Sequence, residues 1–478
     1  MTDAEEFRRY AHQVADWMAD YFEQVEHYPV RSQVKPREIY DQLPAAAPQQ
    51  PEDMAQILAD FQSIILPGMT HWQHPSFFAY FSANNSYPSV LAEMLTATLG
   101  AQCMIWETSP AAAELEEKVL QWLQPLMGLP TGWSGVIQPT ASDATLCALL
   151  TAREQRSQYA VNQHGLQGQP RYRVYGSAEL HSSVEKDIKI AGLGRENYVK
   201  IPVDESFAMR PEALQAAIEA DRKAGHEPLA VVAAIGTTSS CGIDPLEPIS
   251  HICEREGLWL HVDAAYAGSA LMLPEYHGMI RGIERADSFV FNPHKWLMTN
   301  FDCSAYYVKD RSALIRTFEI LPEYLKTGVD SQVNNYRDWG VPLGRRFRAL
   351  KLWFVLRSYG VEGLQAKLRQ DIALTRELGQ WVQNHPEFEL MAPVQLGLVC
   401  LRHHPTGLDD EAALDRLNAA LLQRLNDSGA LYLTQTRLNG RYAIRFSIGQ
   451  THTQPEHVQR AWQRMLAEVE LLSAKKTN

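Results

Sequence analysis

Apolar residues recur at spacings of three and four near the start of the chain, from Phe7 through Tyr10 and Trp17 to Val25. This spacing predicts an amphipathic helix, because residues three and four apart lie on one face of a helix. A helix with such a broad apolar face needs a partner surface, either the body of the protein or a second subunit.

The middle of the chain alternates short apolar runs with helical or polar segments. Five runs have the character of buried strands, and they cover residues 136–137, 172–175, 230–235, 259–262 and 288–291. Buried strands that alternate with helices, such as the one predicted over 142–153, indicate a mostly parallel sheet covered on both faces. Ligands of such folds bind at the carboxyl ends of the strands, so the residues that follow each strand are the first candidates for a site.

The last part of the chain has a different pattern. A long helical pattern covers about 344–384, and strand-like segments follow at 388–391, 398–402, 431–436 and 442–447. The last two segments flank Asn439-Gly440, a strong signal for a β-hairpin, and a final helix is predicted after Pro455. We therefore expect an N-terminal helical segment over 1–80 that serves in dimerisation, a large α/β domain over 81–350 and a small α+β domain over 351–478.

Composition and charge narrow the function classes. The 478 residues suffice for two or three domains. Hydrophobic residues make up 45% and charged residues 21%, which excludes a disordered or collagen-like chain. The 44 Lys and Arg against 56 Asp and Glu give a formal net charge of −12. An acidic chain without a basic block is a poor candidate for binding nucleic acid or anionic lipid.

The cysteines and the terminus indicate a cytoplasmic protein. None of the six cysteines forms a CxxC pair, so a zinc ribbon or thioredoxin-like site is not expected and the thiols are expected to be reduced. The N-terminus lacks the apolar core of a signal peptide. The longest uncharged stretch, 62–92, contains three prolines and many polar residues, so we expect no membrane span.

Two charged residues stand at the ends of predicted strands. Lys295 follows the strand 288–291 within Asn292-Pro293-His294-Lys295-Trp296, where its neighbours are largely apolar or aromatic. Most lysines are solvated, but a desolvated lysine has a lowered pKa and can form a Schiff base. Asp263 ends the strand 259–262, either as a turn cap or as a carboxylate that keeps a ring nitrogen protonated. Enzymes that use pyridoxal 5'-phosphate (PLP) combine such a lysine with such an aspartate.

Candidate phosphate and ring contacts are weaker signals. Residues 135–142 run from a strand into a helix, and hydroxyls with free N–H groups at a helix N-terminus bind phosphate, although Ser and Thr there are usually only caps. Thr237 and Thr238 supply a second hydroxyl pair after the strand 230–235. His181 would suit stacking on a flat ring, whereas a histidine is more often an ordinary core or surface residue.

Five longer motifs carry a resemblance to a known family. They are NPHKW at 292–296, HVDAAYAGSA at 261–270, HSSVEK at 181–186, FDCSAYYV at 301–308 and PLGRRFRALKLWF at 342–354. Together they resemble the group II PLP-dependent amino-acid decarboxylases, most closely the aromatic-L-amino-acid decarboxylase branch. The resemblance extends from about Phe7 to the C-terminal helix, and motifs of this length are far more specific than a single GxGxxG.

The resemblance implies a fold type I PLP enzyme with an α/β large domain that holds the cofactor, and an obligate homodimer with the active site at the subunit interface. It implies that Lys295 binds PLP covalently, that Asp263 pairs with the pyridine nitrogen, and that His181 stacks on the ring near the substrate carboxylate. A tyrosine on a mobile loop protonates the substrate carbon in this family, and Tyr324 within 321–326 matches it. The remaining cofactor contacts that it implies are Thr140, Ala141, Ser142, Thr238, Ala265, Asn292 and His294.

The resemblance also implies which residues contact the side chain of the substrate. Trp72, Tyr80 and Phe81 line the side-chain pocket in the family, which favours flat aromatic substrates over glutamate or diaminobutyrate. His71 and His74 stand three apart in the same segment, but no cysteine or carboxylate accompanies them at ligand spacing, so no metal is predicted.

Three positions on the substrate side distinguish this chain. Ser82 follows Phe81 where relatives often have proline and then a hydroxyl residue, so the hydroxyl is displaced by one position. Met104 stands where an aromatic residue is common and would widen the pocket, because methionine is adaptable. Gly344 leaves room for a large ring. These positions favour catechol, phenol or indole substrates without choosing among them.

The sequence therefore predicts PLP-dependent decarboxylation of an aromatic L-amino acid, of the DOPA, tyrosine, tryptophan or 5-hydroxytryptophan class, to the amine and CO2. The main alternative is decarboxylation coupled to oxidative deamination, which releases an aldehyde; relatives with that reaction usually replace the loop tyrosine or the stacking histidine, and both Tyr324 and His181 are present. A PLP-fold regulator would carry a basic helix-turn-helix before the fold, and no such basic helix is found at this N-terminus. A catalytically dead homologue would be expected to lose Lys295 or Asp263, and both are present. A nicotinamide oxidoreductase would need a Gly-rich fingerprint after its first strand, which is missing here.

Overall fold

The computed structural model describes residues 3–320 and 332–474. By its internal contacts the chain groups into two compact units. Unit 1 comprises Met1–Ser82, Gln380–Glu389 and Leu401–Asn478, and unit 2 comprises Ala83–Gly379 and Leu390–Cys400. The division into 1–80, 81–350 and 351–478 stays a prediction about domains; by contacts, residues 351–379 group with the large unit.

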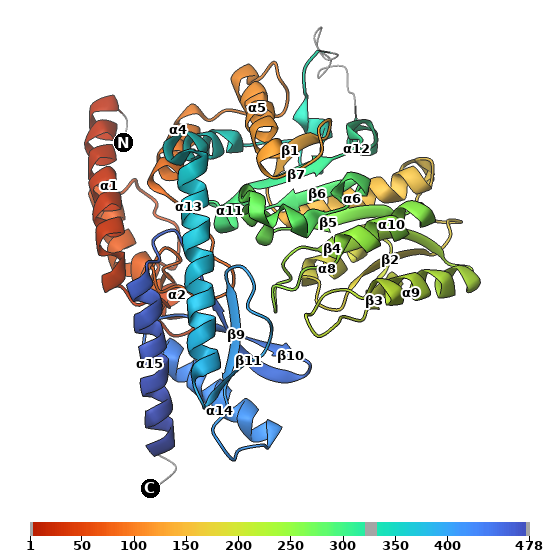
Figure 1. The fold of residues 1–478 in the computed structure, drawn as a ribbon. Coiled ribbons are helices and arrows are strands. Elements are labelled where there is room, and N and C mark those ends of the chain that lie inside the picture. The colour runs from red at the N-terminus through yellow and green to blue at the C-terminus, as the bar shows by residue number, and fades with distance from the viewer. Residues whose placement is uncertain (1–2, 321–331, 475–478) are drawn as a thin grey trace. The chain divides into compact units, whose positions relative to one another are not determined.

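Unit 2 is built on a seven-stranded sheet (Figure 1). In spatial order the strands are β1 (Ser134–Gln138), β7 (Ser304–Val308), β6 (Ser288–Phe291), β5 (Trp259–Asp263), β4 (Glu227–Ala234), β2 (Tyr172–Ser177) and β3 (Tyr198–Ile201). The pairs from β6 to β3 are parallel, and β7 is antiparallel to both β1 and β6. The predicted α/β class with a mostly parallel sheet is confirmed, and all five predicted strands are present.

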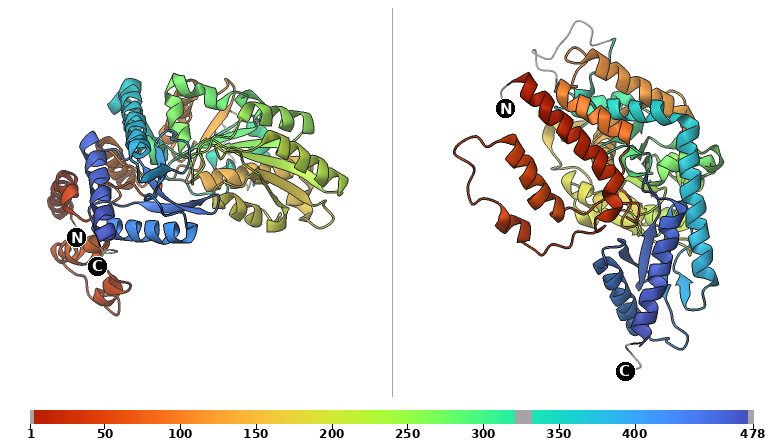
Figure 2. Two further views of the ribbon diagram at one scale, coloured as in Figure 1. Left: turned by 60° about the horizontal axis from the view of Figure 1, so that its bottom comes forward. Right: turned by 90° about the vertical axis from the view of Figure 1, so that its left-hand side faces the viewer.

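Helices cover both faces of this sheet, as the sequence pattern predicts (Figures 1 and 2). The helices α6 (Ala141–Arg156) and α8 (Ser182–Ile190) pack together on one face, and α9 (Pro211–Lys223) and α10 (Leu246–Glu256) pack together on the other. A strand between two helical layers meets no water, which is why β4 is buried from its second residue to its last.

The other helices of unit 2 surround the sheet. They are α4 (Tyr87–Leu99), α5 (Pro110–Leu126), α7 (Ala160–His164), α11 (Pro293–Trp296), α12 (Arg311–Phe318) and the first part of α13 (Arg348–Asn384). The long helical pattern predicted over 344–384 is interrupted at Gly360, whose φ of 65° is accessible to glycine and breaks the helix in two.

Unit 1 contains the N-terminal helices and most of the C-terminal part of the chain. Its helices are α1 (Ala4–Gln24), α2 (Glu38–Gln42), α3 (Met54–Asp60), α14 (Glu411–Asp427) and α15 (Pro455–Ala474). A second sheet, most of whose residues group with unit 1, has the order β10 (Thr434–Leu438), β11 (Arg441–Ser447), β9 (Leu398–His403) and β8 (Phe388–Leu390). Its β10–β11 hairpin turns at Asn439-Gly440 with φ values of 51° and 80°, as the sequence signal requires.

Two further observations concern the helices and the cysteines. In the part of the chain that the structure describes, no helix has the length and apolarity needed to cross a membrane. All six cysteines lie in the described residues, are buried and form no disulfide there.

Candidate active site

Lys295 lies in α11, directly after the carboxyl end of β6, and its side chain is half-buried. Its neighbour Trp296 is fixed by two contacts. Trp296 stacks on Tyr266, with ring centroids 4.7 Å apart, and its indole N–H donates to Asp371 Oδ2 at 2.9 Å. The sequence that follows β6 therefore holds this lysine at the edge of the sheet where ligands bind in α/β folds.

Asp263 lies at the same edge, because β5 pairs in parallel with β6 and Asp263 is opposite Val290. Its Oδ1 accepts the N–H of Ala265 at 3.0 Å. No hydrogen bond from the described residues reaches its Oδ2. The carboxylate is therefore oriented by one oxygen and available to a ligand through the other.

His181 is the N-cap residue of α8, and its ring is oriented by Ser183. The backbone N–H of Ser183 donates to His181 Nδ1 at 3.2 Å, so the neutral ring carries its proton on Nε2. Partial burial lowers the pKa of His181, the nearby charge of Lys295 lowers it further, and Asp263 opposes both. The imidazole, the lysine and the aspartate thus interact electrostatically within unit 2.

The N-terminus of α6 offers backbone donors for an anion. Thr140 forms a capping box with Asp143, in which the threonine hydroxyl donates to the carboxylate at 2.6 Å. Its hydroxyl proton is therefore used inside the protein. The N–H groups of Ala141 and Ser142 belong to the first turn, where a helix has no partner for them, and such groups bind phosphate.

His294 and Asn292 are fixed so that they present hydrogen-bond donors. His294 Nδ1 accepts the N–H of Cys303 at 2.9 Å, which places the ring proton on Nε2. Burial lowers the pKa of His294 to about 3, with Lys295 contributing, so the ring stays neutral near pH 7. Asn292 Oδ1 accepts the hydroxyl of Ser304 at 2.7 Å, which leaves the amide nitrogen of Asn292 as a donor.

Ala265 and Thr238 lie at the ends of neighbouring strands. Ala265 O accepts the N–H of Asn292 at 3.0 Å, which links the segments that follow β5 and β6. Of the two threonines after β4, Thr237 is buried and its hydroxyl accepts the N–H of Gly242 at 2.9 Å. Thr238 is half-buried, which makes it the more accessible hydroxyl of the pair.

This donor set fits PLP. A lysine amine can form a Schiff base with the aldehyde of PLP, and a carboxylate can keep the pyridine nitrogen protonated. The His181 imidazole interacts electrostatically with both the lysine and the aspartate. A helix N-terminus with two neutral side-chain donors suits the phosphate.

The predicted substrate residues divide between the units. Met104 and Gly344 are close in unit 2, because Gln102 Oε1 accepts the N–H of Arg345 at 2.7 Å and Arg345 O accepts the N–H of Cys103 at 3.0 Å. A Cβ atom on Gly344 would lie 3.2 Å from Gln102 Nε2, so any larger residue would crowd this junction.

The other four substrate residues, Trp72, Tyr80, Phe81 and Ser82, are in unit 1. Trp72 and Tyr80 stack with centroids 5.8 Å apart, and Arg445 lies over the ring of Phe81 at 5.1 Å. Ser82 is buried.

Tyr80 has a strained backbone that unit 1 holds in place. Its φ is 53°, a value that is uncommon for a non-glycine residue. Its N–H donates to Thr434 Oγ1 and its carbonyl accepts from Arg445 Nη1, both at 3.2 Å. Its hydroxyl lies 3.2 Å from that of Tyr432. Thr434, Arg445 and Tyr432 were not predicted, since nothing local in the sequence links them to residue 80.

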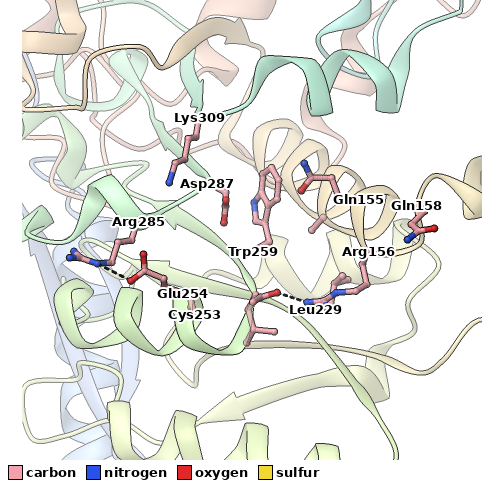
Figure 3. Close-up of a pocket in the computed structure, with 13 residues that line it drawn as sticks. Gln155, Arg156, Gln158, Leu229, Cys253, Glu254, Trp259, Arg285, Asp287 and Lys309 are labelled. Carbon is pink, nitrogen blue, oxygen red and sulfur yellow. Dashed lines mark hydrogen bonds and ion pairs between the residues drawn. The ribbon is translucent and has the colours of Figure 1, made fainter.

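Tyr324, the predicted proton donor, is outside the described residues. A pocket of about 480 Å³ lies at the opposite edge of the sheet and contains Trp259, Asp287 and Lys309, near the amino ends of β5 and β6 and after β7 (Figure 3). None of the predicted site residues lines it, so the pocket is separate from the proposed chemistry.

Asp187 is a carboxyl group beside the site that sequence reasoning missed. It lies on α8, is 2% exposed, and has no hydrogen-bond partner for Oδ2 among the described residues. Burial raises its pKa to about 7, and the carboxylates of Asp143 and Asp263 add to the rise while Lys186 opposes it. A single polar residue on a helix carries no sequence signal that it points inward.

We expect Asp187→Asn to stabilise the protein increasingly as the pH rises from about 4 to 7. Over this range the unfolded carboxyl loses its proton while the folded one keeps it, so the wild type loses stability that the amide variant retains. The gain at pH 7 is expected to be on the order of 3 kcal/mol, measured by denaturant unfolding at several pH values. Asp409→Asn, at a side chain that is 94% exposed, is the control and should show no such trend. A variant that follows the wild type at every pH would contradict this assignment.

Comparisons with known proteins agree with this geometry. Residues 36–404 match the family described as the pyridoxal-dependent decarboxylase conserved domain. The chain is 44% identical to the aromatic-L-amino-acid decarboxylase of Sus scrofa over 99% of this chain and 98% of the relative. It is 44% identical to the phenylacetaldehyde synthase of Arabidopsis thaliana over 96% of this chain and 95% of the relative.

A solved structure has the same fold as this chain. The structure of Oryza sativa TDC with PLP and tryptamine superposes with a TM-score of 0.95 at 35% identity, and the match covers 98% of this chain and 99% of that chain. The donor set at the carboxyl edge of the sheet, the extent of the family match and these relatives lead to one conclusion: this chain belongs to the pyridoxal-dependent decarboxylase family.

Proposed function

We propose that this chain decarboxylates an aromatic L-amino acid, of the DOPA, tyrosine, tryptophan or 5-hydroxytryptophan class, to the amine and CO2. The observation that carries the proposal is the arrangement of Lys295, Asp263 and His181 at the carboxyl edge of the sheet. Relatives named for aromatic amino acids support the substrate class.

When bound, PLP supplies an electron sink that takes up the electrons left by the departing CO2. In this proposal Lys295 holds the cofactor covalently, and Asp263 holds a proton at the ring nitrogen through its unused Oδ2. His181 presents Nε2–H towards the substrate carboxylate. The N–H groups of Ala141 and Ser142 bind the phosphate together with His294 Nε2–H and the Asn292 amide. Tyr324 delivers a proton to the substrate carbon after CO2 has left.

The aromatic cluster of unit 1 supports a flat substrate. The stacked rings of Trp72 and Tyr80 offer an aromatic surface, and Tyr80 remains 47% exposed. A strained residue whose N–H and C=O are both held by other residues is typical of a binding site. Within unit 2, Met104 and Gly344 are the proposed substrate contacts, and the absence of a Cβ on Gly344 leaves space beside Gln102.

We also propose that the active unit is a cytoplasmic homodimer. Five exposed apolar residues follow one stripe of α4: Tyr87, Leu91, Met94, Leu95 and Leu99. An apolar stripe of this length on a helix indicates an interface, and a second copy of the chain is the proposed partner. Phe7 on α1 is also 56% exposed, which fits the predicted role of the N-terminal helix in dimerisation. Six buried cysteines that form no disulfide in the described residues are typical of a reducing compartment.

A second reaction deserves consideration because one relative is a phenylacetaldehyde synthase at 44% identity. On the same scaffold, decarboxylation would be coupled to oxidative deamination and release an aldehyde. Tyr324 and His181 are both present, which favours the amine as the product.

We expect Tyr324→Phe to slow amine formation by about 100-fold, because general acid catalysis contributes on this scale. Without the phenol, oxygen competes for the unprotonated carbon, so aldehyde formation and oxygen uptake should rise. Amine, aldehyde and dissolved oxygen are measured together on purified protein loaded with PLP. The control is Tyr40→Phe, at a side chain that is 66% exposed. Unchanged amine yield without oxygen uptake would remove Tyr324 from the mechanism.

A further inference from the structure

The helix that carries Lys295 is too short to be stable by itself. α11 has four residues, so it forms a single turn. One turn gains little from its own hydrogen bonds, and the carbonyl groups at a helix C-terminus have no intrahelical partner. The orientation of Lys295 therefore depends on the groups that bind these carbonyls.

Asn84 binds two of these carbonyl groups. Its backbone N–H donates to His294 O at 3.0 Å, and its side-chain amide Nδ2 donates to Lys295 O at 2.6 Å. Asn84 is 2% exposed, so these bonds are shielded from water. All three residues belong to unit 2.

Ser86 extends this contact to the residues after α11. Its hydroxyl donates to Met298 O at 2.6 Å. Met298 has a φ of 49°, an uncommon value for a side-chain-bearing residue, so an external bond is needed to hold the turn. The segment 84–86 thus acts as a C-terminal cap for the lysine helix, although it lies more than 200 residues earlier in the chain.

We propose that Asn84 is a positioning residue for Lys295, whose side-chain amide fixes the carbonyl group and hence the direction in which the lysine side chain leaves α11. This inference rests on the proposed function, because it assigns Asn84 a role in presenting the lysine to PLP. Trp296 fixes the helix from another side through Tyr266 and Asp371, and His294 is fixed by Cys303. Of these contacts, only the hydrogen bond from the Asn84 side chain ends on Lys295.

The test compares two variants of Asn84 with a matched buried asparagine. Asn84→Asp replaces the donor with an oxygen that repels Lys295 O, and Asn84→Ala removes the side-chain bond while keeping the backbone bond to His294. Asn418 is the control, because it is 0% exposed and its Nδ2 donates to the carbonyl of His403 at 2.8 Å. Asn418→Asp and Asn418→Ala lose this bond and a second one to the carbonyl of Leu414 at 2.9 Å, both away from the lysine.

Three readouts separate positioning from stability. They are kcat and KM with an aromatic amino acid, the rate at which PLP attaches to the apoprotein, and the pH dependence of the visible absorbance of the bound cofactor. We expect Asn84→Asp to lower kcat by about 100-fold with little change in KM, since a misplacement of about 1 Å can cost this much. It should also slow PLP attachment and shift the absorbance titration, with Asn84→Ala intermediate. The Asn418 variants should lower only the melting temperature.

The proposal is overturned if the Asn84 variants lose thermal stability as the Asn418 variants do but keep kcat, the attachment rate and the absorbance titration of the wild type. If Asn84→Asp does not fold, Asn84→Ala carries the same comparison. PLP attachment is measured without a substrate. A wild type that binds PLP at Lys295 but decarboxylates nothing would therefore refute the proposed function and still leave the role of Asn84 to be decided.

Discussion

Replacing Lys295 with alanine is expected to lower decarboxylation by about 10⁴-fold or more, the scale on which enzymes lose activity when a covalent catalytic group is removed. In the proposed site the amine of Lys295 would form the covalent bond to PLP, and the contacts of Trp296 and His294 hold this residue at the carboxyl edge of β6. The variant should also lose the visible absorbance band of the covalently bound cofactor. Both are measured on protein incubated with PLP and then dialysed.

Lys309→Ala is the matched control for this experiment. Lys309 follows β7 and lines the pocket at the opposite edge of the same sheet (Figure 3), where its Nζ donates to Glu284 O at 3.1 Å. It should keep both the activity and the absorbance band. A Lys295→Ala protein that retains the band and turns over substrate would show that another amine holds the cofactor.

Asp263→Asn is expected to lower kcat/KM by about 10²–10³-fold, equivalent to roughly 3–4 kcal/mol of transition-state stabilisation. The amide keeps the shape of the side chain and the bond from Ala265 N–H, but it removes the negative charge that would hold a proton at the ring nitrogen. Without that proton the ring withdraws electrons less strongly. Because Lys295 is unchanged, PLP should still attach, so the loss should appear in turnover rather than in cofactor content.

Asp287→Asn separates this effect from a general effect on the sheet. Asp287 precedes β6 at the other edge, and its Oδ2 accepts the N–H of Leu260 at 2.7 Å, much as Asp263 accepts that of Ala265. We expect the Asp287 variant to keep nearly full activity. Equal losses in the two variants would mean that the sheet, rather than the charge at its carboxyl edge, determines the rate.

The sheet could be predicted from the sequence because its central strands are apolar runs between helices. The strand at 288–291 and the strand at 259–262 were expected within one residue of β6 and β5. Two strands of the seven-stranded sheet could not be predicted, each for a different reason. β3 is only four residues long and includes an exposed lysine, so it has little apolar signal. β7 is apolar, but its antiparallel pairing with β1 and β6 depends on contacts between distant segments.

The site could be predicted where chemistry coincides with a strand end. Asp263 is the last residue of β5 and Lys295 follows β6, so their position at one edge follows from the parallel sheet. Asn84 could not be predicted in this way, because 211 positions separate it from Lys295. The same holds for Arg445 and Tyr432, which contact Tyr80 from a distant part of the chain. Such contacts are set by tertiary packing, for which a single sequence carries no periodic signal.

The most direct test of the central claim is a product assay on purified, PLP-loaded protein. DOPA, tyrosine, phenylalanine, tryptophan, 5-hydroxytryptophan, histidine and glutamate are each supplied, and CO2, amine, aldehyde and oxygen uptake are quantified together. We expect equal amounts of CO2 and amine from an aromatic substrate, without oxygen uptake. Aldehyde with oxygen uptake, or turnover of glutamate or histidine alone, would contradict the account.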